Sequence, residues 1–437
     1  MIAAPASGAG KTTVTLGLLR ALAGSGVAVA PAKVGPDYID PAFHAAASGR
    51  PCRNLDPWAM RPPTLAGEIA ALARAGQLVI CEGVMGLFDG AGRRARGSTA
   101  ELARLTGWPV VLVIDAHGQG QSVAALINGF ARHRGDVRVA AAIFNKVGNP
   151  GHLGLLSQAC RRAVPEIALA GGLPATPALA LPERHLGLVQ AGEHPALDRF
   201  LDAAAEAVSR HLDLELLRRL ARPARIGGGP RAVPLPPLGQ HIAVAGDAAF
   251  AFAYEAVLAG WRHAGATISR FSPLADAAPD RSADAVYLPG GYPELHAGRL
   301  AGNARFLDGL RHAAARGAAL YGECGGYMVL GEELVDADGT RHAMAGLLPL
   351  ETSFTAPRLH LGYRRAAIAD GAGAGPLGAD GAAFRGHEFH YARVVREGPG
   401  RPLFDCADAD GRRLGPAGRI KGRVAGSFVH LIDRADP

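Results

Sequence analysis

The chain has 437 residues, 49% of them hydrophobic and 19% charged, and its formal net charge is +7. This length exceeds one ordinary core and predicts two domains or more, while the apolar runs end well short of the roughly 18 residues that a membrane span needs. The five cysteines are an odd number without C-x-x-C spacing, which argues against a disulfide framework and a zinc site. The arginines are scattered without interleaved aromatic residues, which argues against a protein that binds single-stranded nucleic acid. We therefore expect a reduced, cytoplasmic protein without nucleic-acid or membrane partners.

A short strand and a helix over residues 12–23 flank the first motif, SGAGKTT. Four residues match the second half of a phosphate-binding loop: Gly8, Gly10, Lys11 and Thr12. In such loops, backbone N–H groups and the lysine hold phosphate, and the threonine hydroxyl binds Mg2+. We expect Thr13 to lie at the nucleotide as well. The usual first glycine is replaced by Pro5, so a chance turn is the alternative.

Four further strands are predicted over residues 26–34, 77–83, 109–116 and 139–147, with helical stretches between them. This alternation indicates a parallel sheet, in which ligands bind beyond the carboxyl ends of the strands. Polar side chains stand at or after those ends: Lys33, Asp37, Asp40, Glu82, Asp115 and Asn145. Together they predict a magnesium and phosphate site, with Asn145 at a purine edge. A cap or turn role is the alternative for each of them.

Residues 222–240 are rich in proline and glycine and lack apolar periodicity, which predicts a linker. After it the alternation restarts, with a helix over residues 252–265 and four strands: residues 241–246, 267–273, 285–291 and 318–324. We therefore predict an α/β protein of two domains, residues 1–221 and 241–437, each a mostly parallel sheet flanked by helices.

The second predicted domain contains a cysteine in a sharp turn between a strand and a helix. Cys324 stands inside G-x-C-x-G, which is typical of a nucleophile elbow, and we expect the helix amino terminus to lower the thiol pKa. The expected oxyanion-hole N–H groups belong to three glycines: Gly290, Gly291 and Gly325. His430, at the end of a strand predicted over residues 424–433, is the candidate general base. A structural cysteine and a structural histidine are the alternatives.

The motifs together resemble one family over nearly the whole chain. They are KVGPDYIDPAFH, RNLDPWAM, CEGVMGLFDG, LPERHLGL, PGGYPE, GECGGYMVLG and GHEFHY. The chain is similar to the cobyrinic acid or hydrogenobyrinic acid a,c-diamide synthases. That family joins a dethiobiotin-synthetase-like ATPase domain of P-loop type to a class I-type, flavodoxin-like glutamine amidotransferase domain.

The resemblance implies an ATP- and Mg2+-dependent enzyme of cobalamin biosynthesis that takes ammonia from L-glutamine. ATP would convert the a and c acetate carboxylates of a corrinoid into acyl phosphates, and ammonia released by Cys324 and His430 would displace the phosphate. It also implies a metal shell of Thr12 and Glu82 completed by one of three acids: Asp37, Asp40 or Asp56. The residues implied near the corrinoid are Tyr38, Asp40 and Asp89. We expect a homodimer.

One position departs from the classical amidotransferase triad. The glutamate two residues after the histidine is replaced by Ile432, and Asp433 should face the wrong way in an extended strand. We therefore predict a Cys–His dyad without a third member. A partition-type P-loop ATPase is the rival from another class, although Ala6 and Ser7 stand where its extra lysine would be expected. Cobyric acid synthase is the rival within the superfamily, and the amino-terminal loop more closely resembles the enzymes of the cobalt-free route.

Overall fold

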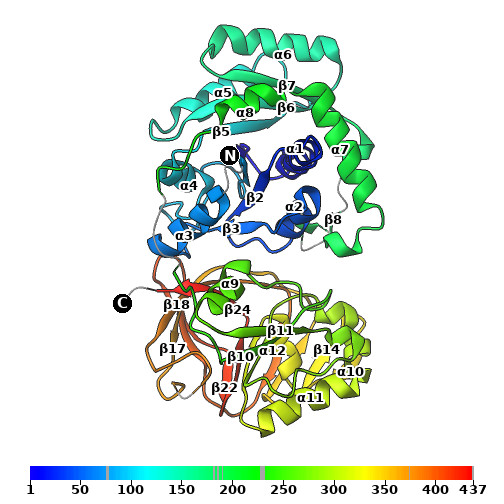
Figure 1. Ribbon diagram of the computed structural model, residues 1–437, viewed down its shortest axis with the longest axis vertical. Coiled ribbons are helices and arrows are strands. Elements are labelled where there is room, and N and C mark those ends of the chain that lie inside the picture. The colour runs from blue at the N-terminus through cyan, green and yellow to red at the C-terminus, as the bar shows by residue number, and fades with distance from the viewer. Residues whose placement is uncertain are drawn as a thin grey trace. The chain divides into compact units, whose positions relative to one another are not determined.

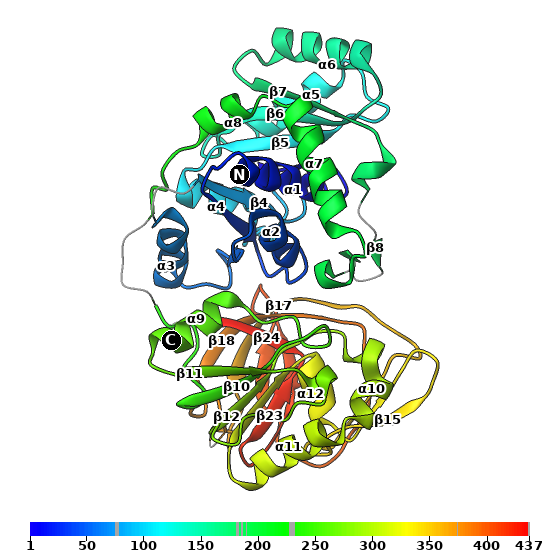
Figure 2. The same ribbon diagram turned by 45° about the vertical axis from the view of Figure 1, so that its right-hand side comes forward.

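The computed structural model describes residues 1–74, 78–180, 183–184, 187–188, 190–226, 232–373 and 375–435. The chain forms two compact units, seen in Figures 1 and 2. Unit 1 comprises Met1–Trp58 and Leu65–Pro230, and unit 2 comprises Ala59–Thr64 and Arg231–Pro437. No helix within the described ranges is long and apolar enough to cross a membrane. Part of the predicted linker, residues 227–231, and much of the LPERHLGL motif lie outside the described residues.

Unit 1 is built on a seven-stranded sheet in the order β3-β2-β4-β1-β5-β6-β7, in which all neighbouring strands are parallel. Its strands are β1 (Ile2–Ala3), β2 (Val29–Val34), β3 (Arg53–Leu55), β4 (Leu78–Glu82), β5 (Val110–Asp115), β6 (Val139–Val147) and β7 (Ala168–Pro174). A separate hairpin pairs β8 (Glu183–Arg184) with β9 (Gly187–Leu188). The strands predicted in the first half are confirmed as β2, β4, β5 and β6.

Helices flank this sheet in Figure 1. They are α1 (Lys11–Gly24), α2 (Asp40–Ser48), α3 (Pro62–Ala73), α4 (Thr99–Thr106), α5 (Val123–Arg132), α6 (Pro150–Ala163), α7 (Leu197–His211) and α8 (Leu214–Leu220), with short 3-10 turns η2 (Pro177–Leu179) and η3 (Ala191–Glu193). Ile114 of β5, Ile127 of α5 and Leu156 of α6 belong to one buried cluster. On α1, a side chain at Gly17 would lie only 2.5 Å from Val208 Cγ2 of α7, so glycine permits the close packing of these two helices.

Unit 2 is built on a six-stranded sheet in the order β11-β10-β12-β13-β23-β22, parallel except for β22. Its strands are β10 (His241–Ala245), β11 (Thr267–Phe271), β12 (Ala285–Leu288), β13 (Ala319–Glu323), β22 (Arg419–Lys421) and β23 (Val424–Ser427). Its helices and 3-10 turns are α9 (Glu255–His263), η4 (Pro273–Ala275), η5 (Pro293–His296), α10 (Ala297–Gly302), α11 (Ala304–Ala315) and α12 (Gly325–Leu330). This parallel sheet confirms the predicted alternation in the second half.

Unit 2 also contains two smaller sheets that the sequence did not suggest. A four-stranded sheet has the order β15-β14-β16-β19 and contains β14 (Glu333–Val335), β15 (Arg341–Ala343), β16 (Leu350–Ser353) and β19 (Arg393–Glu397). A five-stranded antiparallel sheet has the order β21-β20-β17-β18-β24 and contains β17 (His360–Ile368), β18 (Ala383–His390), β20 (Phe404–Ala407), β21 (Arg413–Ala417) and β24 (Val429–Arg434).

The prediction of one strand over residues 424–433 is wrong. The chain leaves the parallel sheet after Ser427 and enters the antiparallel sheet at Val429, so two strands in two different sheets replace the single one. The Ser427 hydroxyl oxygen accepts a hydrogen bond from the Val429 N–H at 3.0 Å and stabilises this switch. His430 is therefore near the beginning of β24, not at the end of a strand.

Candidate functional site

The phosphate-binding loop in unit 1 has the backbone that its glycines allow. Gly8 and Gly10 have φ angles of 77° and 93°, in the left-handed region, and Gly10 caps the start of α1. A side chain on Gly10 would overlap the amide group of Asn145, which donates a hydrogen bond from Nδ2 to the Ala9 carbonyl oxygen at 3.0 Å. Asn145 thus supports the loop here, and its contact with a purine stays a prediction.

Two lysines lie at this loop, of which the sequence identified one. Lys11 is buried and donates hydrogen bonds from Nζ to the carbonyl oxygens of Met85, at 2.7 Å, and Ala6, at 3.4 Å. Burial lowers its pKa from the ordinary value. Lys146, at a positive φ of 57°, reaches Asp115 Oδ2 at 2.6 Å and the Gly8 carbonyl oxygen at 3.4 Å. Its place directly after Asn145 was the only sequence signal for it.

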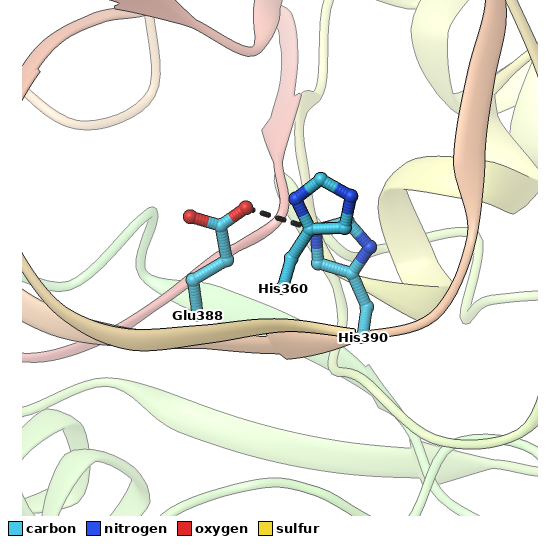
Figure 3. Close-up of side chains that lie close together, drawn as sticks. All are labelled: His360, Glu388 and His390. Atoms are coloured by element: carbon cyan, nitrogen blue, oxygen red, sulfur yellow. Dashed lines mark hydrogen bonds and ion pairs between the residues drawn. The ribbon is translucent and has the colours of Figure 1, made fainter. Parts of the chain in front are cut away.

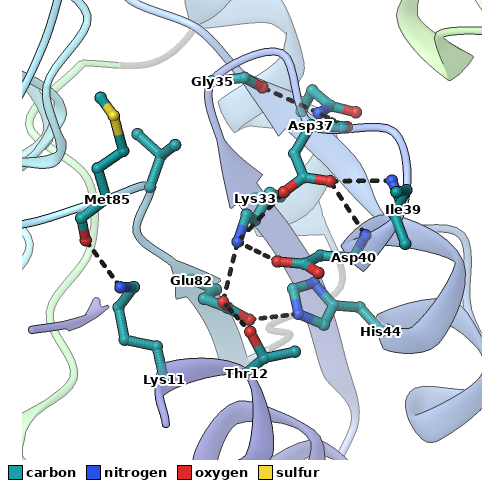
Figure 4. A network of polar contacts seen from close by, with 12 residues as sticks. Lys11, Thr12, Lys33, Gly35, Asp37, Ile39, Asp40, His44, Glu82 and Met85 are labelled. Carbon is teal, nitrogen blue, oxygen red and sulfur yellow. Dashed lines mark hydrogen bonds and ion pairs between the residues drawn. The ribbon is translucent and has the colours of Figure 1, made fainter. Parts of the chain in front are cut away.

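A buried polar network lies beside the loop, drawn in Figure 4. Glu82, the last residue of β4, accepts hydrogen bonds from the Thr12 hydroxyl at 2.8 Å and from Lys33 Nζ at 2.9 Å. His44 Nε2 lies 2.6 Å from its second carboxylate oxygen. Asp40 also forms an ion pair with Lys33. Helices α1 and α2 and strands β2 and β4 thus bring together Glu82, its three partners and Asp40, as expected for the carboxyl edge of a parallel sheet.

The electrostatics of this network keep Glu82 charged. Burial by itself would raise the pKa of Glu82, but Lys33 and His44 hold it well below the ordinary value. Burial would likewise lower the pKa of Lys33, and Asp40 and Glu82 raise it instead. Burial and the neighbouring Asp37 raise the pKa of Asp40 to about 7. Near neutral pH, Lys33 and Glu82 therefore form an ion pair. Asp40, with a pKa of about 7, changes its charge in that same pH range.

The other predicted ligands lie in the loops around this network. Asp37 Oδ1 accepts hydrogen bonds from the Ile39 and Asp40 N–H groups, and its Oδ2 lies 3.7 Å from Lys33 Nζ. Three further residues were predicted in these loops: Asp56 accepts a hydrogen bond from the Trp58 N–H, Asp89 accepts one from the Gly86 N–H, and Tyr38 is half-buried beside Asp37. Thr13 donates from its hydroxyl to the Leu179 carbonyl oxygen at 3.3 Å. Their roles toward a ligand stay predictions.

The donor set fits Mg2+, which prefers hard oxygen ligands. The Thr12 hydroxyl and a Glu82 carboxylate oxygen are in direct contact, and carboxylates of Asp37 and Asp40 lie on the other side of Lys33. Asp56 is fully buried, like Glu82, and accepts a hydrogen bond from the Trp58 N–H, and which of the three acids joins Thr12 and Glu82 stays a prediction.

The nucleophile elbow in unit 2 is strained. Cys324 has φ 47° and ψ −103°, between the end of β13 and the start of α12, and its N–H donates to the Ser427 carbonyl oxygen at 2.8 Å. A side chain on Gly322 would lie 2.7 Å from the backbone of Gly326, and one on Gly326 would overlap Leu288. Because both flanking positions exclude a side chain, the predicted sharp turn is confirmed and its glycines are required by close packing.

The predicted oxyanion glycines and His430 surround this elbow. A side chain on Gly290 would overlap the His430 ring, and one on Gly325 would lie 2.8 Å from Pro293 Cδ and 3.1 Å from the Gly291 nitrogen. The loop after β12 therefore packs against both Gly325 and His430. The Cys324 thiol itself donates to the Phe389 carbonyl oxygen at 3.9 Å, and the catalytic roles of the three glycines and the histidine stay predictions.

The pKa expectation for the thiol is wrong. Burial raises the pKa of Cys324 well above its ordinary value, and Glu294 raises it further, although the Gly325 N–H acts in the opposite direction. Helix α12 has only six residues, so its terminal charge is too small to overcome desolvation of a thiolate. Burial also lowers the pKa of His430 to about 3. The unliganded pair is therefore a neutral thiol and a neutral imidazole.

Asp433 is engaged elsewhere, in agreement with its exclusion from the site. Its carboxylate accepts hydrogen bonds from the Arg61 backbone N–H at 2.7 Å, Nη2 at 2.8 Å and Nε at 3.0 Å. Glu323, directly before the nucleophile, is an acid that faces the histidine: its Oε2 lies 3.8 Å from His430 Nδ1. The sequence did not indicate Glu323, because the third acid of the triad was expected two residues after the histidine, at position 432.

Figure 3 shows a second group of potential ligands, His360, Glu388 and His390. The two imidazoles are stacked, with ring centroids 4.7 Å apart and an interplanar angle of 1°. A metal ion lies in the plane of each imidazole that binds it, and parallel stacked rings share no such plane. Glu388 also accepts a hydrogen bond from Arg364 Nε at 2.6 Å. The group is therefore a stacked, ion-paired cluster, not a metal site.

Comparison with known proteins assigns both halves of the chain. Residues 1–189 match the CobQ/CobB/MinD/ParA nucleotide binding domain, and residues 241–437 match the CobB/CobQ-like glutamine amidotransferase domain. A hydrogenobyrinate a,c-diamide synthase of Sinorhizobium sp is 56% identical over 437 residues, 100% of this chain and 98% of that protein. The protein of the same name from Rhizobium meliloti is 56% identical over 436 residues, 99% of this chain and 98% of that protein.

Solved structures include a glutamine amidotransferase that is 18% identical, with a TM-score of 0.30 over 43% of this chain and 89% of that one.

Proposed function

The chain belongs to the hydrogenobyrinate a,c-diamide synthase family, and we propose that it converts the a and c acetate carboxylates of hydrogenobyrinic acid into amides. The reaction is a glutamine-dependent amidation in cobalamin biosynthesis, with ATP bound by the nucleotide-binding domain. The observation that carries the proposal is the presence, in one chain, of a phosphate-binding loop beside buried acids and of a strained cysteine elbow beside a buried histidine.

Unit 1 supplies the activation of the carboxylate. We propose that the N–H groups of Gly8 and Gly10 and the ammonium group of Lys11 hold ATP phosphates, and that Lys33 neutralises charge on the transferred phosphoryl group. A magnesium ion, held by Thr12 and Glu82, supplies further charge neutralisation when it is bound. The corrinoid carboxylate attacks the γ-phosphorus, ADP leaves, and an acyl phosphate results. Ammonia then attacks the acyl carbon, and phosphate leaves.

Unit 2 supplies the ammonia. We propose that His430 takes the thiol proton as the Cys324 sulfur attacks the amide carbon of glutamine. The N–H groups of Gly291 and Gly325 face the developing oxyanion. The proton passes to the leaving nitrogen as the C–N bond breaks, and water hydrolyses the resulting thioester. Because the raised pKa of Cys324 and the lowered pKa of His430 keep both neutral before the attack, proton transfer and sulfur attack must be coupled.

Tyr38, Asp40 and Asp89 are proposed to contact the corrinoid, and the protein is proposed to act as a homodimer in the cytoplasm. The five cysteines are free thiols in the structure and all are buried, which supports a reducing compartment. The positive net charge of +7 suits a substrate with many carboxylates.

The test is an amidation assay with a defined macrocycle. Purified protein is incubated with ATP, Mg2+ and glutamine together with hydrogenobyrinic acid, cobyrinic acid or an already a,c-diamidated corrinoid, and the added amides are counted by mass spectrometry. We expect two amides on hydrogenobyrinic acid and none on the diamidated corrinoid. Amidation of the diamidated compound alone would favour a cobyric acid synthase activity instead, and ATP hydrolysis without any amide would contradict the proposal.

A further inference from the structure

Glu323 is a buried acid that the dyad does not use. It is the last residue of β13, directly before Cys324, and only 1% of its surface is exposed. Its Oε2 lies 3.8 Å from His430 Nδ1. A buried carboxylate is costly unless something binds it, so its partners indicate what this position is built for.

Two donors from two other strands fix the carboxylate. The Tyr287 hydroxyl of β12 donates to Oε2 at 2.7 Å, and the Leu431 N–H of β24 donates to Oε1 at 3.0 Å. Leu431 directly follows His430, so the bond to Oε1 ties the acid to the backbone that carries the histidine. With Oε1 held there, Oε2 is the oxygen that faces the ring.

Two neighbouring residues pack near the imidazole, which is fully buried. A side chain at Gly290 would overlap the ring at Cε1, and the Phe252 ring lies 6.5 Å from it between centroids. Rotation of His430 is therefore restricted, and Nδ1 is kept toward Glu323. A separation of 3.8 Å is too long for a hydrogen bond, but catalytic contacts are often long in an unliganded site and shorten when substrate binds.

We propose that Glu323 is the positioning residue for His430 and takes the role of the glutamate that is absent at position 432. Its ionised carboxylate accepts a hydrogen bond from Nδ1–H, which leaves Nε2 of the neutral imidazole unprotonated and able to take the thiol proton of Cys324. It then stabilises the imidazolium that exists until that proton passes to the departing ammonia. This inference rests on the proposed glutaminase function of Cys324 and His430.

The surroundings give the proposal a pH signature. The titratable groups near Glu323 include Cys324, Tyr287 of β12, Tyr321 of β13 and His430 of β24. Those facing His430 from β18 are His387, Glu388 and His390. Burial raises the pKa of Glu323 to about 7. Only the ionised form carries the charge that stabilises the imidazolium, so glutaminase kcat should rise as the pH passes upward through about 7 and then level off.

Glu323→Gln tests this role in the full-length protein. We expect glutaminase kcat to fall roughly 10²- to 10⁴-fold with little change in KM, because the amide presents no charge to the imidazolium. The rise of kcat near pH 7 should disappear, Glu323→Asp should restore part of the rate, and ammonia-dependent synthesis should persist. Glu332→Gln, a surface change at a residue paired with Arg396, should behave like the parent protein. Parental kcat and an unchanged pH profile in Glu323→Gln would overturn the proposal.

A second measurement is made on the parent protein. In the parent protein, ¹⁵N NMR of labelled histidine, with His430→Asn for assignment, should show the proton of the His430 ring on Nδ1. A proton on Nε2 would overturn the proposal. The glutaminase assignment is checked separately with Cys324→Ala, because persistence of glutaminase activity in that variant would remove the proposed function rather than the role of Glu323.

Discussion

At the scale of single residues, Glu82 is the centre of the nucleotide site. It accepts hydrogen bonds from Thr12 of the loop helix and Lys33 of the neighbouring strand, and it contacts His44. Lys33 and His44 lower its pKa, so it stays ionised. Its three contacts connect α1, β2 and α2 to β4. The same carboxylate is thus both a structural partner and a proposed metal ligand.

We predict that Glu82→Gln destabilises unit 1 by about 3–5 kcal/mol, because it removes one partner of a buried ion pair and leaves Lys33 undercompensated. It should also raise the Mg2+ concentration needed for synthesis, since an amide is a poorer ligand for a hard cation. Because the pKa of Glu82 is held below 4.5, its contribution is present above that pH and lost below it, so the difference from the parent should shrink in acid.

Denaturant unfolding at several pH values and Mg2+ titrations of synthesis measure both effects of Glu82→Gln. Glu206→Gln, whose parent residue forms an exposed pair with Arg210, is the matched control and should change neither quantity. Unchanged stability and unchanged Mg2+ dependence in Glu82→Gln would remove Glu82 from the centre of the site.

At the scale of elements, the elbow between β13 and α12 depends on close approach of backbones. Gly326→Ala would push a methyl group into the Leu288 carbonyl of β12. We therefore expect the free energy of unfolding of unit 2 to fall by roughly 1–3 kcal/mol or more. Glutaminase activity should fall sharply because the thiol would move, while ammonia-dependent synthesis should be retained. Thermal unfolding and the two assays provide the measurement.

The control for the elbow is Gly302→Ala at the end of α10, where an added side chain meets nothing within 4 Å. This change should leave stability within about 1 kcal/mol of the parent and glutaminase activity unaltered. Equal effects of the two substitutions would show that the packing of the elbow is not the reason for its glycines.

A second element-scale contact joins the segment Ala59–Thr64 to β24 within unit 2. We predict that Arg61→Ala destabilises unit 2 by about 3–5 kcal/mol at neutral pH, because it leaves the fully buried Asp433 without its cation. Burial already raises the pKa of Asp433 above 3.8, and loss of Arg61 raises it further. The loss of stability caused by Arg61→Ala should therefore be largest at neutral pH, where Asp433 is ionised, and should shrink as the pH falls toward 4.

Unfolding curves near pH 7 and near pH 4 measure this effect. Arg262→Ala is the control, since its partner Glu255 lies 3.8 Å away at the surface and such pairs contribute about 0–1 kcal/mol. A small loss of stability in Arg61→Ala, or a loss that grows as the pH falls, would contradict the role given to Arg61.

At the scale of the whole molecule, each chemistry is contained within one compact unit. The residues proposed to bind ATP phosphates and Mg2+ belong to unit 1, and those proposed to release ammonia belong to unit 2. Substitutions in one unit should therefore remove either glutaminase activity or ATP-dependent synthesis and leave the other activity in place.

We predict that Cys324→Ser loses roughly a thousandfold or more of glutamine-dependent synthesis, because a hydroxyl gives up its proton less readily and is a much weaker nucleophile than a thiol. Amidation with added ammonium salt should persist. Lys11→Ala is the complementary variant: it should lose synthesis from either nitrogen source and keep slow glutaminase activity. The measurement is the ratio of ammonia-supported to glutamine-supported rates. Loss of both by folded Cys324→Ser would mean that the cysteine also serves synthesis.

The sequence by itself determined those features that depend on neighbours along the chain. The glycine spacing around Lys11 and Cys324 is sufficient to predict a phosphate loop and an elbow, because the turn and the following helix lie within a few residues. Buried β-branched runs such as Val110–Asp115 predict parallel strands for the same reason. Family resemblance then added the reaction, which no local pattern contains.

Only the tertiary structure decided the contacts between distant residues. Glu323 meets the Leu431 N–H across 108 positions, and Glu82 meets Lys33 across 49, so their partners depend on strand order and register rather than on spacing. The switch of sheets at Phe428 likewise depends on which strands lie beside β23 and β24. Burial, which raises the thiol pKa of Cys324 against the local expectation, is a property of the surrounding fold, because desolvation sums over every element packed around the group.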